Sequence, residues 1–62
     1  LELEALSHIK EVSIYDMNGR LINLETPDTL KSNIDFNDIP KGLYIVKAKT
    51  DQGFKSIKVL NQ

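Results

Sequence analysis

Three polar residues near the start of this 62-residue chain, Ser7, His8 and Asp16, are of the types that a hydrolytic triad uses. Nucleophilic catalysis by such a set requires a base oriented by a third group, and an oxyanion hole inside a formed pocket. A chain of this length buries only about 60% of the surface that it exposes when unfolded, so it has little volume for such a pocket. We therefore predict that the domain is not an enzyme.

A second candidate for chemistry, a calcium loop, begins at Asp16-Met17-Asn18-Gly19. An EF-hand loop needs Gly at its sixth position and Glu at its twelfth, where this chain has Leu21 and Pro27. The chain has no Cys and a single His, so it lacks the usual ligands of a zinc site. Its three glycines stand singly and make no phosphate-binding loop. The sequence predicts neither a metal nor a cofactor.

The charged side chains are balanced and interleaved, with 8 basic and 9 acidic residues and a formal net charge of −1. Because affinity for nucleic acid and for anionic membranes comes largely from basic clusters, this balance argues against both kinds of binding module. The longest apolar run, Leu43-Tyr44-Ile45-Val46, is far shorter than the roughly 20 residues of a membrane-spanning helix.

A β-hairpin is predicted over residues 12–24, where two alternating runs flank Asn18-Gly19. Two turns compete for this sequence. A two-residue turn at Asn18-Gly19 would mix polar and apolar side chains on each face. A three-residue loop, begun by Asp16 and closed by Gly19 with a positive φ, places Ile14 opposite Ile22 and gives one apolar face. We predict the three-residue loop, with Val12, Ile14, Ile22 and Leu24 in the core.

A second hairpin is predicted over residues 43–60, with its turn in Asp51-Gln52-Gly53-Phe54. The alternation favours a register with Ala48 opposite Ile57, which also sets Lys47 opposite Lys58 on the other face. The predicted core residues of this hairpin are Tyr44, Val46, Ile57 and Val59.

Between the hairpins, a short strand is predicted near residues 33–36, with Ile34 and Phe36 inward. A type I turn should follow over Ile39-Pro40-Lys41-Gly42, because Pro fixes φ at the second position and Gly is favoured at the fourth. Residues 1–11 are ambiguous. Their start alternates as a strand does, whereas Leu, Glu and Ala prefer helix, and we favour a strand. Two hairpins with one apolar face each predict a small antiparallel β-sandwich.

Several motifs follow one another in a fixed order and spacing. Val12-x-Ile14-Tyr15-Asp16-x-Asn18-Gly19-Arg20 comes first, Ile34-x-Phe36 then leads into Ile39-Pro40-x-Gly42-Leu43-Tyr44-Ile45-Val46, and Lys55-x-x-Lys58-Val59 comes last. In this order, over about residues 9–62, they resemble the C-terminal sorting domain of the type IX (Por) secretion system of Bacteroidetes.

The resemblance implies an immunoglobulin-like β-sandwich that serves as an address for a secreted cargo protein. The cargo, which can itself be a hydrolase, would reach the periplasm of a Gram-negative bacterium by a general signal peptide. The outer-membrane translocon would then recognise the folded domain. A sortase would remove it, and the cargo would be released or attached to the cell surface. No nucleic acid, small-molecule substrate or cofactor is implied.

Site residues follow from the same resemblance and from the predicted strands. Asp16, Asn18, Gly19, Pro40 and Gly42 would form the turns. The outward residues that we predict for recognition by the translocon are Tyr15, Arg20, Lys47, Lys49, Lys55 and Lys58.

The chain departs from the family in its first residues, where a Tyr-Pro-Asn-Pro-like segment and an initial strand are expected and neither is found. We therefore expect residues 1–62 to be one N-terminally truncated domain that ends at the natural C-terminus of a larger secreted protein. A missing strand would leave a sheet edge free for self-association. Two alternatives stay open: an accessory module that binds a carbohydrate or a cell surface, and a structural spacer.

Overall fold

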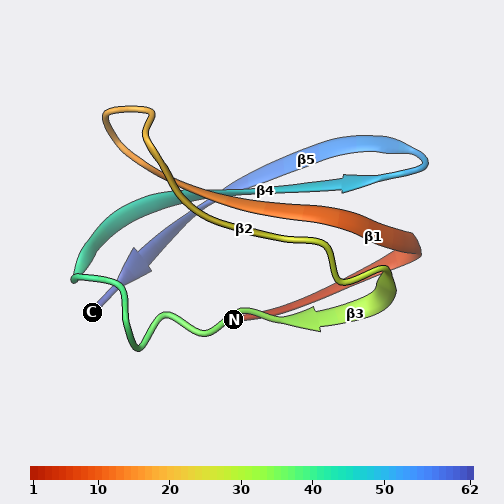
Figure 1. The fold of residues 1–62 in the computed structure, drawn as a ribbon, viewed down its shortest axis with the longest axis horizontal. Helices are drawn as coiled ribbons and strands as arrows, with labels where there is room; N and C mark the ends of the chain where they lie inside the picture. Colours follow the sequence, from red (N-terminus) through yellow and green to blue (C-terminus); the bar gives the residue numbers. More distant parts are fainter.

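All five strands pair antiparallel in one sheet in the computed structural model, which describes residues 1–62. Strand makes up 69% of the chain and there is no helix, so the prediction of an all-β antiparallel domain is confirmed. The immunoglobulin-like arrangement stays a prediction. The sheet has the order β2-β1-β4-β5, with β3 also paired to β1 (Figure 1). The strands are β1 (Glu2–Asp16), β2 (Leu21–Glu25), β3 (Thr29–Asn33), β4 (Gly42–Thr50) and β5 (Gly53–Asn61).

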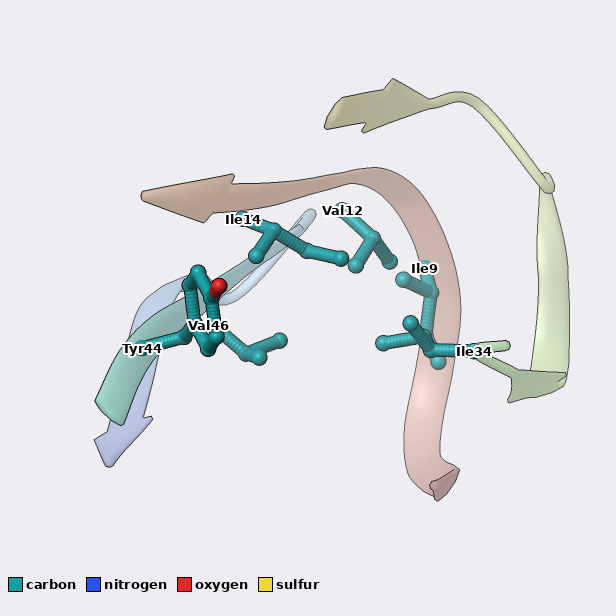
Figure 2. Close-up of a cluster of buried hydrophobic side chains, with 6 residues drawn as sticks. All are labelled: Ile9, Val12, Ile14, Ile34, Tyr44 and Val46. Carbon is teal, nitrogen blue, oxygen red and sulfur yellow. The ribbon is translucent and has the colours of Figure 1, made fainter. Parts of the chain in front are cut away.

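Strand β1 is long and turns sharply near its middle, so that it belongs to two limbs of the sheet (Figures 1 and 2). Its first half pairs with β3, and its second half lies between β2 and β4. The pairing with β4 is irregular between Ile9 and Glu11, which makes Lys10 an extra residue at the turn. Bulges of this kind bend a strand and let it pass from one layer to another. The strand predicted for residues 1–11 is confirmed.

The hydrophobic core lies inside the bend of β1, where the two limbs face each other (Figure 2). Phe36 and Tyr44 meet edge to face there, with their ring centroids 6.1 Å apart. Leu3, Ala48 and Val59 add partly buried contacts around the core. The six buried side chains of the core are Ile9, Val12, Ile14, Ile34, Tyr44 and Val46.

The β1–β2 hairpin has the predicted three-residue loop but a different register beyond it. Tyr15 pairs with Leu21 next to the loop, whereas Ile14 pairs with Asn23 instead of Ile22. Ile22 is therefore an extra residue in β2, and one extra residue sends the rest of a strand to the opposite face. Ile22 is 39% exposed and Leu24 49% exposed, so the prediction that both lie in the core is wrong.

The β4–β5 hairpin has the predicted faces but is shifted along the strands by two residues. Its turn is the pair Asp51-Gln52, and Val46 therefore lies opposite Ile57, while Ala48 lies opposite Lys55. A shift of two residues keeps each side chain on its own face, because side chains alternate with a period of two. The predicted opposition of Lys47 and Lys58 is wrong, since Lys47 faces Ser56.

Both predictions for the segment between the hairpins need correction. Strand β3 ends at Asn33, where the predicted strand of residues 33–36 begins, although Ile34 is buried and Phe36 packs against the core. The turn closes between the carbonyl of Phe36 and the N–H of Ile39, 3.1 Å apart, and not across residues 39–42. The Ile39 carbonyl accepts a hydrogen bond from the Asn61 side chain instead.

Core substitutions should cost far more stability than substitutions on the outside of the same strand. Ile14 is 1% exposed and Leu6 is fully exposed, and both lie in β1. Truncation of Ile14 to Ala should lower the free energy of unfolding by about 2–5 kcal/mol, because it leaves a cavity. Leu6→Ala should leave it nearly unchanged. Urea unfolding of the two variants tests this, and equal losses would contradict the assignment of the core.

Candidate recognition surface

The outward face of the β4–β5 hairpin carries three lysines, Lys47, Lys49 and Lys58, and the first two lie beside the aromatic ring of Phe54. Lys49 lies directly opposite Phe54 in the strand register. Its Nζ is 5.6 Å from the centroid of the Phe54 ring, and the Nζ of Lys47 is 4.5 Å from the same centroid. Both are within the range of a cation–π attraction. Phe54 is 59% exposed, so the ring holds two positive charges at the surface.

Apolar side chains extend this face away from the lysines. Leu43 lies opposite Leu60, and the two are 40% and 59% exposed. Tyr15 of β1 lies opposite Ile45 of β4, and both are half-buried. We call this region the basic face; it consists of Tyr15, Leu43, Ile45, Lys47, Lys49, Phe54, Lys58 and Leu60. One acidic residue, Glu11 of β1, lies on the same side of the sheet, opposite Lys49.

The six residues predicted for recognition are not all in one place. Four of them share the basic face: Tyr15, Lys47, Lys49 and Lys58. Lys55 lies on the opposite, inward side of β5. Arg20 lies just after the loop of the β1–β2 hairpin, where its Nε donates to a carboxylate oxygen of Asp16, 3.0 Å away.

Asp16 organises the loop of the β1–β2 hairpin. One oxygen of its carboxylate accepts hydrogen bonds from the backbone N–H groups of Asn18 and Arg20, each at 2.9 Å. Gly19 has a φ of +84°, a conformation that side chains with a Cβ avoid, so it closes the loop as predicted. The backbone hydrogen bond from Arg20, helped by its guanidinium, lowers the pKa of the Asp16 carboxyl.

Pro40 and Gly42 do not form the predicted turn, since Gly42 begins β4, and the segment before β4 is held by a contact that the sequence analysis missed. The side-chain amide of Asn61 donates to the carbonyls of Ile39 at 2.9 Å, Pro40 at 3.3 Å and Phe36 at 3.4 Å. The hydroxyl of Tyr44 also donates to the Pro40 carbonyl. Asn61 therefore fastens the end of β5 to the segment between β3 and β4. Its inward place in the alternation of β5 is the one sequence signal for this role.

The residue types of a hydrolytic triad are not brought together. The Nδ1 atom of His8 lies 3.3 Å from the carboxylate of Asp28, and Asp16 is bonded to Arg20 instead. Lys10 also donates to Asp28 at 2.8 Å, and this hydrogen bond lowers the pKa of Asp28 and raises that of Lys10.

The structure contains no group of three or more His, Asp or Glu side chains that could hold a metal ion. It also contains no helix long and apolar enough to cross a membrane.

Acid should weaken the fold in part through Asp16. Since its pKa is lower in the folded state than its usual value near 3.9, the unfolded chain takes up the proton first. The stability that Asp16 contributes is then complete above about pH 5 and is lost as the pH falls through the folded-state pKa. We expect Asp16→Asn to flatten the fall in unfolding free energy between about pH 5 and pH 3, measured by urea unfolding. Glu25→Gln, at an exposed carboxyl, is the control, and an unchanged slope in the Asp16 variant would refute this role.

Removal of the Asn61 amide should loosen the C-terminal end of the sheet. Asn61→Ala leaves three carbonyls without this donor, and we expect a loss of about 1–2 kcal/mol in the free energy of unfolding. Amide hydrogen exchange should also accelerate in β5 more than in β2. Gln62→Ala is the control at the neighbouring, exposed residue. Equal stability of the two variants would show that the Asn61 amide does not stabilise this end of the sheet.

One of three comparisons with known proteins gives a match. A family model described as "Secretion system C-terminal sorting domain" matches residues 1–62. The match is wider than the stretch of about residues 9–62 that carries the motifs, so it includes the first half of β1. No curated protein and no solved structure matches the chain.

Proposed function

We propose a function for the basic face of this chain, which belongs to the family of secretion system C-terminal sorting domains. The basic face is the surface by which the outer-membrane translocon recognises the domain. The family membership makes the chain a type IX sorting signal, and a sorting-signal domain is non-catalytic. Such a signal implies a cargo that is secreted or displayed at the cell surface. The cargo can be an enzyme even though the signal is not.

The basic face supports this proposal because it combines the two features of a docking surface. Its lysines are exposed and stand on paired strands, so the strand register sets their spacing without participation in the core. Charges of this kind steer encounter and orientation between partners. The neighbouring Leu43 and Leu60 offer apolar area beside them, which supplies affinity. We expect the partner surface to be acidic with an apolar centre.

Processing by the sortase of the system is the second part of the proposal. In this scheme the cargo passes from the periplasm of a Gram-negative bacterium through the outer membrane, and the sortase then removes the domain or exchanges it for a surface anchor. Removal fits a domain whose role is confined to recognition.

Exposure of Phe54 favours one alternative, an accessory module that binds a carbohydrate on an aromatic platform. Against it, the amines of Lys47 and Lys49 both lie over the Phe54 ring and compete with a sugar for that place. Replacement of Phe54 by Ala separates the two roles. The binding module requires this ring, whereas the sorting signal requires the charges.

Export of a fused reporter tests the proposed function. We expect the triple variant Lys47→Glu, Lys49→Glu and Lys58→Glu to reduce the reporter in the medium severalfold, because it reverses the charge of the basic face. Lys41→Glu, at an exposed lysine in the segment before β4, should leave export unchanged. Urea unfolding of both variants checks that each is folded.

Deletion of residues 55–62 from the same fusion should abolish export, since it removes most of β5 with Lys58 and Asn61. A structural spacer would tolerate this deletion. Normal export by the triple lysine variant would refute the role of the basic face, and normal export after the deletion would refute the sorting role itself.

A further inference from the structure

Two of the unpaired strand edges in this sheet, those of β1 and β5, lie beside incompletely covered apolar side chains; the outer edges of β2 and β3 are also unpaired. The first half of β1 pairs with β3 on one side, but β4 joins its other side only from Ile9 onward, so residues 2–8 have a free edge. Strand β5 pairs with β4 alone, so its outer edge is free from Gly53 to Asn61 (Figure 1). Free edges present unpaired N–H and C=O groups that can accept another strand.

Beside the free edge of β1 the core is open. A cavity of about 150 Å³ lies between the two limbs and is lined mainly by apolar side chains, among them Leu3, Ala5 and Ile57. A second, more polar hollow of about 490 Å³ adjoins it and reaches from residues 4–7 of β1 to the tip of the β4–β5 hairpin. Ile57 faces inward yet is 45% exposed, because no strand lies over it. A strand added to the edge of β1 would cover it.

The two free edges carry opposite and incompletely balanced charges. Glu2 and Glu4 of β1 share one base, Lys31, whose Nζ lies 3.7 Å and 3.4 Å from their carboxylates. Lys55 and Lys58 are the only charged residues of β5, and neither has an acidic partner within 4.0 Å. Pairing of β5 with a second β5 would bring lysines together, whereas pairing with β1 brings them to glutamates.

One antiparallel register pairs apolar side chains on the inward face of the two strands and opposite charges on their outward face. If Ala5 lies opposite Ile57, then Leu3 lies opposite Val59 on the inward face, and Glu4 lies opposite Lys58 on the outward face. Lys58 would then flank Glu4 on the side away from Lys31, since Lys31 lies opposite Glu4 in β3. A shift of two residues would set Lys55 opposite Ala5, so it is less favourable.

We propose that a second copy of this chain binds at the free edge of β1 through its β5 strand, in the register that pairs Glu4 with Lys58. The contact uses two different edges, so two copies can exchange it reciprocally and leave neither edge free. The inference does not depend on the sorting role, because it rests on the edges, the cavity and the charges alone.

Light scattering of the purified chain over a range of concentrations tests the association. We expect a concentration-dependent rise in mass. Charge reversal by Glu4→Lys or Lys58→Glu should weaken self-association by about three- to tenfold, because each replaces an attractive cross-strand pair with a repulsive one. The double variant, Glu4→Lys with Lys58→Glu, restores opposite charges in the same register and should recover the association. A monomer at all concentrations, or a double variant no stronger than the single ones, would overturn the proposal.

Cysteine pairs test the register, since the chain has no Cys of its own. A mixture of the single variants Glu4→Cys and Lys58→Cys can form a mixed disulfide only between two copies. We expect this mixed species on oxidation, and less of it when Glu2→Cys replaces Glu4→Cys. Equal yields, or a higher yield with Glu2→Cys, would refute the register. Neither measurement involves export, so its result is separate from that of the reporter experiment.

Discussion

The bend of β1 is the constraint on which the rest of the structure depends. Ile9 and Val12 are three residues apart and would face opposite sides of a regular strand, yet each is 1% exposed. The extra residue between them, Lys10, is the reason that both point inward. The bend is also fastened from outside. The N–H of Asp28 donates to the Ile9 carbonyl at 2.8 Å, and the Asp28 carboxylate accepts from Lys10.

A single bent strand gives a short chain two facing limbs without a second sheet. Ile34 comes from the β3 side of the core and Val46 from the β4 side, and β1 lies between them in the sheet (Figure 2). The small number of strands also leaves the core open on one side. The limb formed by β3 and the first half of β1 has too few strands to cover β5, and Ile57 stays exposed there. The free edge, the cavity and the expected self-association therefore share one origin.

The sequence predicted the inward or outward direction of side chains better than it predicted the registers between strands, for a physical reason. Alternation determines which side of a strand a residue takes, and this worked for β4, where Tyr44 and Val46 are buried, and for β5, where Val59 packs against the core. The prediction that Ile57 lies in the core is wrong, because it faces inward but is 45% exposed where no strand covers it. It does not determine how far two strands slide by steps of two, and the register of this hairpin was wrong. An extra residue such as Ile22 in β2 cannot be recognised from the alternation of polar and apolar residues. The role of Asn61 was missed because its acceptors lie more than 20 residues away along the chain.

In the proposed function, the inward face of the β4–β5 hairpin serves folding and the outward face serves recognition. Inward side chains such as Val46 hold the limbs together, whereas Lys47 and Lys49 project outward and contribute no buried contact to the core. Stability in a chain this short is marginal, so substitutions in a recognition surface made of core residues would tend to unfold the domain. Substitution of outward lysines on paired strands does not remove core contacts. Their charge can be changed while the register, and with it the position of each neighbour, is fixed by backbone hydrogen bonds. Loss of recognition in an outward variant would therefore report on the charge itself and not on the fold.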